Sequence, residues 1–394
     1  MKGRSYCSFI LSIIVLMHIC GFANASPPID EIREIVGRIA LQAPSSDALS
    51  RLDADNPEKG LREIDPYARY LPPPLSRGGA KRSPLFLGIE VFPYGSRLWM
   101  RTDPGGPAAR AGLPETSQLL AIDRESVGAN GFERIAGQLD RAMERKRVAL
   151  TISRRPGDKG KTYSVRPGCF SAPSFTWRRE KKSFIIRIRE FAAHETVPGI
   201  VALYKTVIRS GAKVIIDLRG CPGGDMYESI ELAGRYTPAR QPLVTTRNRD
   251  GMVESYFAPG GSKLPRPLCL LLDRRSASAA EVFAGILQFH RLTPLVGESS
   301  FGKCVSQTLV PLSDGGWLWL TNLAVYFPNM DSCTGKGLLP GLPYPDIAVE
   351  DTDVIVKNIK KRLLAPTRTG AAPGVTHSAR ALRGRPPEVP VHAP

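Results

Sequence analysis

Three polar residues in the C-terminal half of the chain have types and spacing that could support hydrolysis without histidine. Ser278 precedes Lys303 by 25 positions, and Gln307 lies 4 positions beyond that lysine. A serine hydroxyl becomes a useful nucleophile when a neighbouring base takes its proton. A lysine amine can be that base only if burial lowers its pKa, because an ammonium ion cannot accept a proton. Ser278 and Lys303 are therefore a candidate nucleophile and base.

Other interpretations of the same residues need weighing. Residues 278–281 read Ser-Ala-Ala-Glu, a capping box that would give Ser278 a purely structural role at a helix start. Residues 297–303 have the spacing of a phosphate-binding loop, but Cys304 stands where that loop requires Ser or Thr. A histidine-based triad is disfavoured because two of the histidines, His377 and His392, lie in the C-terminal tail.

The elements that must position these residues are apolar strands followed by glycine turns and helices. Residues 214–218 form an expected buried strand, which leads through a glycine turn at 219–224 into a helix over 227–236. Residues 267–273 form the next buried strand and deliver Ser278, after which a helix is expected over 279–290. This alternation predicts an α/β core.

Flanking this alternation, further elements of the core follow the same patterns. They are a strand over 184–191, a helix over 197–210, a hairpin of strands 305–311 and 317–327, and a helix over 353–363.

A serine at the start of a helix also offers backbone donors for a developing oxyanion, because the first N–H groups of a helix have no partner within it. The N–H of Ala279 is one expected donor, and the turn containing Gly223 could aim a second.

These motifs resemble those of the carboxyl-terminal processing proteases, the tail-specific serine–lysine peptidases. The resemblance covers nearly all of residues 60–350 and rests on Ser-Ala-Ser-Ala at 276–279, Phe-Gly-Lys at 301–303 and Asp-Leu-Arg-Gly-Cys-Pro-Gly-Gly at 217–224. It implies that Ser278 is the nucleophile, Lys303 the base and Gln307 the residue that orients the lysine. It also implies an endopeptidase that processes or degrades proteins near their C-terminus, with no metal or other cofactor. A non-catalytic peptide-binding scaffold of the same fold is the alternative.

Residues 83–167 resemble a PDZ domain, above all through Pro-Ala-Ala-Arg-Ala-Gly-Leu at 107–113. Within them we expect strands at 85–91, 119–123 and 148–154 and an amphipathic helix at 132–145. PDZ domains hold a terminal carboxylate with backbone N–H groups of a glycine-containing loop. Here that loop would consist of Phe86, Leu87, Gly88 and Ile89. Glu90 stands where the family usually has glycine, and its charge would repel a carboxylate unless the side chain faces away.

The ends of the chain predict export and a disordered tail. Basic residues at positions 2 and 4, an apolar run over 9–17 and Ala-Asn-Ala at 23–25 indicate a signal peptide at residues 1–25. The expected order is then an N-terminal helical segment at 26–82, the PDZ-like domain at 83–167, the protease core at 168–364 and a disordered tail at 365–394. The location would be the periplasm or the exterior.

The composition of the chain limits which kinds of binding partner are expected. The net charge of +17 favours anionic surfaces such as a membrane or a wall polymer, but dispersed basic residues without a recognisable motif argue against a nucleic-acid function. Five cysteines follow the signal peptide, which allows at most two disulfides, and their spacing shows no metal-ligand pair. The connectivity stays open, although Cys221 and Cys304 flank the predicted site. An adaptor lipoprotein and oligomerisation are expectations that come with the family.

Overall fold

A computed structural model describes residues 27–73, 85–128, 132–143, 145–181, 183–208, 211–261 and 263–363. The predicted signal peptide at 1–25 and tail at 365–394 lie outside these residues. The chain divides into two compact units, residues 1–352 and 353–394. The second begins with most of α10 (Thr352–Leu363), which agrees with the helix expected at 353–363.

A mainly parallel sheet forms the centre of the larger unit, and its strand order is β10-β11-β12-β15-β16-β19. All neighbours in this sheet are parallel except β10 and β11. Its strands are β10 (Phe175–Glu180), β11 (Ser183–Ile188), β12 (Lys213–Asp217), β15 (Cys269–Leu272), β16 (Leu295–Gly297) and β19 (Leu342–Pro343).

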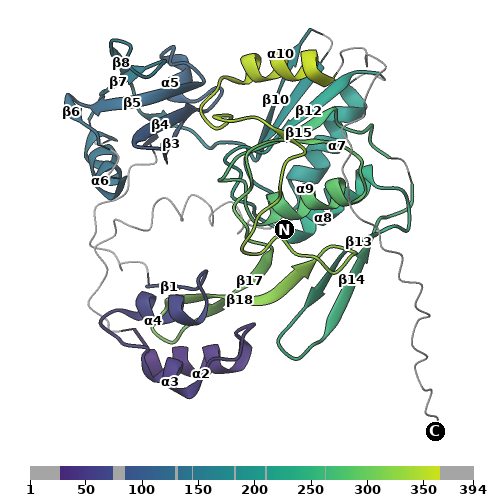
Figure 1. Ribbon diagram of the computed structural model, residues 1–394. Helices are drawn as coiled ribbons and strands as arrows, with labels where there is room; N and C mark the ends of the chain where they lie inside the picture. The colour runs from purple at the N-terminus through teal and green to yellow at the C-terminus, as the bar shows by residue number, and fades with distance from the viewer. Residues whose placement is uncertain are drawn as a thin grey trace, which may run out of the picture. The chain divides into compact units, whose positions relative to one another are not determined.

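Three helices pack with this sheet in one hydrophobic core, and α8 and α9 lie side by side below its strands in Figure 1. They are α7 (Thr196–Thr206), α8 (Met226–Tyr236) and α9 (Ala279–Phe289). The apolar runs at 214–216 and 269–272 are completely enclosed, as expected for strands covered on both faces. The α/β core predicted from sequence is confirmed.

An antiparallel sheet carries the lysine segment. Its order is β1-β18-β13-β14, with β17 paired to β18. The strands are β1 (Arg69–Leu71), β13 (Pro242–Arg247), β14 (Val253–Phe257), β17 (Val305–Pro311) and β18 (Trp317–Tyr326). The N-terminal helices share a core with β17 and β18 that includes Leu61, Leu318 and Leu320. They are α2 (Ile29–Ile39), α3 (Ser46–Ser50) and α4 (Pro57–Ile64).

Residues 89–165 form a separate antiparallel sheet, ordered β3-β4-β5-β7-β8 with β6 beside β5, around a hydrophobic core of their own. The elements are β3 (Ile89–Tyr94), β4 (Arg97–Thr102), α5 (Pro107–Arg110), β5 (Thr116–Ile122), β6 (Glu125–Ser126), α6 (Phe132–Met143), β7 (Val148–Ser153) and β8 (Lys161–Val165). We call this part the β-rich module. Its identity as a PDZ domain stays a prediction.

The single strand expected at residues 85–91 is wrong, because the chain breaks at Gly88. β2 (Leu85–Phe86) pairs with β9 (Gly168–Cys169) where the chain enters and leaves the module, and β3 starts afresh at Ile89. Gly88 has a φ of 67°, and a Cβ added there would lie 2.9 Å from the Cα of Gly106. The positive φ of Gly88 and its close approach to the backbone of Gly106 both suit glycine, and they interrupt the strand.

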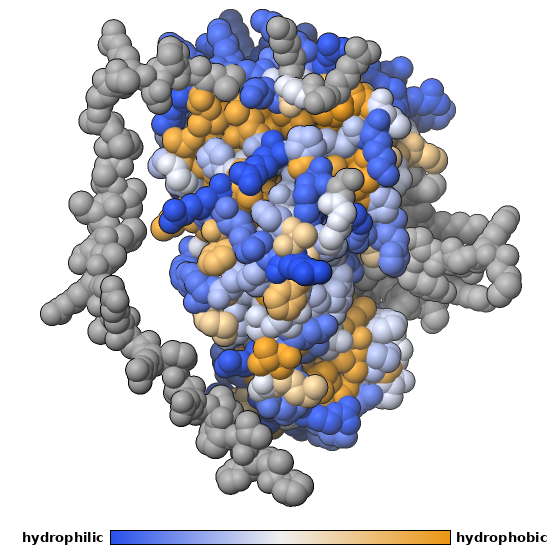
Figure 2. Space-filling model, turned by 90° about the vertical axis from the view of Figure 1, so that its right-hand side faces the viewer, coloured by the Kyte–Doolittle hydropathy of each residue, from blue (hydrophilic) through white to orange (hydrophobic). Residues whose placement is uncertain are grey.

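The surface is mixed in character. On the face drawn in Figure 2, hydrophobic residues gather in patches between hydrophilic ones. Folded proteins ordinarily expose apolar surface, so the interior clusters are what define the fold.

Candidate active site

Ser278 lies in a strained turn between β15 and α9. Its φ is 55° and its ψ is −122°, a backbone conformation that residues with a Cβ rarely adopt. Because β12 and β15 are parallel neighbours, the turns that follow them meet at the same edge of the sheet. The glycine turn after β12 therefore lies against Ser278. A Cβ added to Gly223, whose φ is 111°, would lie 2.7 Å from the Cβ of Ser278.

Backbone donors are available beside the serine. An added Cβ at Gly223 would also lie 2.9 Å from the nitrogen of Ala279, so the two predicted oxyanion residues are adjacent. Among the described residues, neither the N–H of Gly223 nor that of Ala279 has a hydrogen-bond acceptor. The carbonyl of Gly223 is occupied, since it accepts from the N–H of Phe191 at 2.8 Å. The turn can therefore present two free N–H groups next to the Ser278 side chain.

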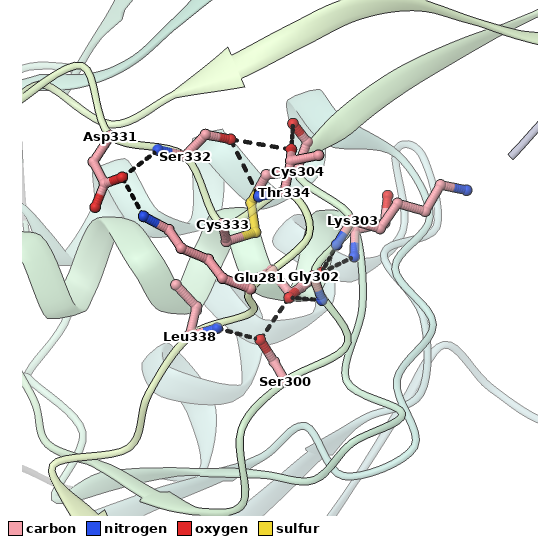
Figure 3. The surroundings of a disulfide bond; sticks show 12 residues. Glu281, Ser300, Gly302, Lys303, Cys304, Asp331, Ser332, Cys333, Thr334 and Leu338 are labelled. Carbon is pink, nitrogen blue, oxygen red and sulfur yellow. Dashed lines mark hydrogen bonds and ion pairs between the residues drawn. A yellow bond between two sulfur atoms is a disulfide. The ribbon is translucent and has the colours of Figure 1, made fainter. Parts of the chain in front are cut away.

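Glu281 joins the serine turn to the lysine loop (Figure 3), and its side chain is fully buried. Its Oε2 accepts from the backbone N–H of Ser278 at 3.0 Å and from that of Lys303 at 2.7 Å. Its Oε1 accepts from the N–H of Gly302 at 2.7 Å and from the hydroxyl of Ser300 at 2.5 Å. The capping-box alternative is thus partly realised, since Glu281 does cap Ser278, but its carboxylate also holds the lysine loop.

The amine of Lys303 lies in a half-buried pocket at the start of β17. Its Nζ donates to Oε1 of Gln307 at 2.5 Å and lies 5.1 Å from the ring centroid of Tyr67 and 5.7 Å from that of Trp319. Loss of water in this pocket lowers the pKa of Lys303 to about 8, although the negative charge of Asp65 acts in the opposite direction. The neutral amine that a base requires is accessible near physiological pH.

The hydroxyl and the amine themselves are not joined. Among the described residues, no hydrogen bond connects Ser278 Oγ with Lys303 Nζ, and in Figure 3 the side chain of Lys303 points away from Glu281. The structure brings the two backbone segments together through Glu281 and gives Gln307 a contact with the lysine. Bonds between catalytic groups are often long or absent before substrate binds.

Sequence reasoning missed Tyr67. Its carbonyl accepts from Nε2 of Gln307 at 2.9 Å, and its hydroxyl donates to the carbonyl of Gly302 at 3.0 Å. Tyr67 lies in the run Leu-Arg-Glu-Ile-Asp-Pro-Tyr at 61–67, which no local pattern connects with Gly302 or Gln307, 235 and 240 positions later. Its observed place is in the wall of the lysine pocket.

The β-rich module contacts the turn that carries Ser278 through Glu90, the residue that departs from the expected PDZ pattern. Oε1 of Glu90 forms an ion pair with Arg275 at 2.6 Å, and its Oε2 lies 3.4 Å from Arg187. The guanidinium of Arg275 also stacks 3.5 Å from the ring centroid of Phe92. The charge of Glu90 is therefore directed toward cations of the core. In the predicted carboxylate loop, Leu87 is buried in the core of the module, whereas Phe86 is exposed.

A buried arginine also connects the module with the core. Arg101 of β4 donates to the carbonyl of Arg219 at 2.9 Å and to that of Ala348 at 2.9 Å. Burial lowers its pKa to about 9. Arg219, in the glycine-turn motif, forms a buried ion pair of 2.7 Å with Asp217. These contacts give the charges of that motif a structural role beside the site.

A disulfide joins Cys304, directly after the lysine, to Cys333 (Figure 3). Both cysteines are buried, and the bridge ties the start of β17 to the loop over residues 331–338. The other three cysteines of the described chain, Cys169, Cys221 and Cys269, are free. Cys221 thus has no disulfide partner, although it flanks the site as expected.

The described residues contain no group of three or more His, Cys, Asp or Glu side chains that could hold a metal ion. Within the same residues, no helix is both long enough and apolar enough to cross a bilayer.

Comparison with known proteins identifies relatives. The model of peptidase family S41 matches residues 183–344. A carboxyl-terminal-processing protease of Picosynechococcus sp. is 32% identical over 286 residues, which cover 70% of this chain and 69% of that protein. A protein of the same name from Synechocystis sp. is 31% identical over 260 residues, covering 64% of this chain and 60% of the relative. The chain thus spans roughly two thirds of the length of these relatives.

The fold also matches a solved structure, the photosystem II D1 C-terminal processing protease. The TM-score is 0.54 at 21% sequence identity, and the match covers 80% of this chain and 92% of that one. At this identity the comparison supports the arrangement of elements.

Proposed function

The chain belongs to peptidase family S41, and from that premise we propose that it is an exported serine endopeptidase that cleaves proteins near their C-terminus. The observation that carries the proposal is the environment of Lys303. Its amine has a pKa lowered to about 8 and lies on a loop that shares the Glu281 carboxylate with Ser278.

In the proposed reaction, Ser278 Oγ attacks the scissile carbonyl while its proton passes to the neutral amine of Lys303. Gln307 orients that amine through the bond from Nζ to Oε1. The N–H groups of Gly223 and Ala279 donate hydrogen bonds to the carbonyl oxygen as it becomes negatively charged, and one such donor typically contributes about 3 kcal/mol. The protonated lysine then gives its proton to the leaving amine. Water attacks the resulting ester and restores the serine hydroxyl.

The substrate would enter by way of the β-rich module. β3 is an edge strand of its sheet, which suits addition of an extended peptide strand. The C-terminal carboxylate of the peptide would bind to the loop Phe86, Leu87, Gly88 and Ile89. Two observations support this role: the positive φ of Gly88, and the ion pair that directs the Glu90 side chain toward Arg275. Protein substrates follow from family membership. An adaptor lipoprotein, oligomerisation and association with an anionic membrane or wall complete the proposal.

Peptide cleavage by the wild-type, Ser278→Ala and Lys303→Ala proteins tests the function. Both variants should lose turnover while keeping the wild-type circular dichroism spectrum, and a free C-terminus should be cleaved faster than its amidated counterpart. Full activity of Ser278→Ala would refute the dyad. Absence of cleavage by the wild-type protein for every peptide tested would favour the inactive scaffold, which the intact set of Ser278, Lys303 and Gln307 argues against. Sequencing the exported protein should find an N-terminus at Ser26.

A further inference from the structure

Glu281 is a charged residue with no exposed surface, and no step of the proposed reaction uses it. A buried carboxylate is costly unless its oxygens receive hydrogen bonds. Each of the two carboxylate oxygens accepts from two donors, and within the described part of the chain these donors come only from the serine turn and the lysine loop. Figure 3 shows Glu281 with the three lysine-loop donors, Ser300, Gly302 and Lys303, arranged around it.

This pattern exceeds what a helix cap requires. A capping glutamate bonds back to the N-cap N–H, and Glu281 does so with Ser278. The remaining three donors lie 19 to 22 positions further along the chain, on a loop that has no part in capping α9. Since Oε2 alone binds the N–H of Ser278 and that of Lys303, one atom determines how far apart the backbones of the two residues lie.

We propose that Glu281 is a positioning residue, which holds the backbone segments of the nucleophile and the base against each other so that the two side chains can meet when substrate binds, without itself contacting substrate. The inference rests on the proposed serine–lysine function. A displacement of about 1 Å between reacting groups can reduce a rate by about 10²-fold. Replacement of Glu281 should therefore lower kcat, whereas KM should change little, because a fully buried side chain cannot touch the peptide.

The charge of Glu281 provides a second readout. The charged groups that act on the Lys303 amine are Asp65 and Glu281, which favour its protonated form, and Arg69, which disfavours it. The uncharged neighbours are Gln307 and the rings of Tyr67 and Trp319. Removing the charge of Glu281 should lower the pKa of Lys303 and move the acid limb of the pH–rate profile to lower pH. A merely structural role would leave that limb in place.

Glu281→Gln is the decisive variant because it keeps the volume of the side chain but leaves only one acceptor oxygen in place of two. The amide NH2 that replaces the other oxygen must face backbone N–H donors, so one loop loses its anchor. Glu228→Gln is a matched control. Glu228 is also buried, and its carboxylate accepts from the N–H groups of His194 at 2.6 Å and Val197 at 2.8 Å, at the start of α7.

Peptide kinetics across pH, with thermal unfolding of each protein, should separate the two variants. Glu281→Gln should lower kcat by roughly 10²-fold with KM within about twofold of wild type. The acid limb of its pH–rate profile should move to lower pH. Glu228→Gln should keep the wild-type kcat and the wild-type position of the acid limb. Glu281→Asp retains the charge but is one methylene shorter, so kcat should fall while the acid limb stays in place. This second variant keeps the inference testable if Glu281→Gln does not fold.

Two results would overturn the inference: a wild-type kcat in both Glu281 variants, or a fall in kcat no larger than that of Glu228→Gln. These outcomes differ from failure of the function itself. If Ser278→Ala is inactive and Glu281→Gln behaves like its control, the dyad survives and only the positioning role is lost. If Ser278→Ala stays active, the dyad fails whatever Glu281 does.

Discussion

The side-chain amide of Gln307 donates a hydrogen bond of 2.9 Å to the backbone carbonyl of Tyr67, 240 positions earlier in the chain. This bond fixes which end of the amide faces Lys303, since Nε2 is engaged and Oε1 is left to accept from the amine. The N-terminal segment therefore orients the side chain that contacts the amine of Lys303. An amine held in this way keeps its lone pair on a defined axis.

Gln307→Ala should lower kcat by roughly 10²-fold, because the amine loses its acceptor and becomes mobile. Gln307→Glu tests how a negative charge at the same contact changes the pKa of Lys303. A carboxylate at this place favours the ammonium form, so the acid limb of the pH–rate profile should shift to higher pH. Steady-state kinetics of both variants against pH would measure these changes. Wild-type kinetics in Gln307→Ala would contradict the orienting role.

The pH dependence of the wild-type protein should report Lys303. Burial lowers its pKa to about 8, and only the neutral amine can accept the serine proton. Log kcat/KM should therefore rise with a slope near one as pH increases toward about 8, and level off above that value. Circular dichroism across the same range controls for unfolding. A rate that stays constant from about pH 6 to 9 would show that another group is the base.

Gly223→Ala should inactivate the protein. The added methyl would lie 2.7 Å from the Cβ of Ser278, in a backbone conformation with a φ of 111° that favours glycine. The turn must shift to relieve the contact, which misaligns the N–H of Gly223, and loss of one oxyanion donor typically costs about 3 kcal/mol of transition-state stabilisation. Activity should be measured beside thermal unfolding, to separate a misaligned turn from an unfolded one. Gly251→Ala is a suitable comparison. Gly251 also has a positive φ, but no atom lies within 4 Å of its added Cβ.

Removing the disulfide should destabilise the protein. The bridge between Cys304 and Cys333 closes a loop with a sequence separation of 29, for which chain entropy predicts a contribution of about 3.6 kcal/mol. The double variant Cys304→Ala/Cys333→Ala should show a lower Tm. It should also show a lower kcat at temperatures where it stays folded, because Cys304 adjoins the base. Cys169→Ala removes an exposed free thiol instead and should leave Tm unchanged. Equal Tm values for the double variant and the wild type would rule out a stabilising bridge.

Much of the core could be predicted because its signals are local. The runs Val-Ile-Ile at 214–216 and Cys-Leu-Leu-Leu at 269–272 are apolar over their whole length, and each is followed by a turn and a helix. Local patterns of this kind also located Ser278 at the start of α9 and the β17–β18 hairpin that begins after Lys303.

Strands without such a pattern went unpredicted. β4 is buried at five successive positions although it contains arginine at both Arg97 and Arg101, and β10 ends in Arg-Arg-Glu. The charges of Arg101 are satisfied by carbonyls at 219 and 348, which no local window of sequence contains. Alternation identifies a strand that has solvent on one face and apolar core on the other, and a continuous apolar run identifies a strand covered on both faces by core. A strand whose buried positions include charged residues shows neither pattern.

The sequence alone determined the chemistry that is available: a serine after a buried strand, a lysine and glutamine on the following hairpin, and glycines where backbone must approach backbone. Only the tertiary structure decided how these groups are held. Tyr67 supports Gln307, Glu281 spans the serine turn and the lysine loop, Glu90 pairs with Arg275, and Cys304 pairs with Cys333. Each of these contacts depends on where folded segments come to lie in space. Hydrophobic burial drives that assembly without direction, so the polar contacts it creates leave no periodic trace in the chain.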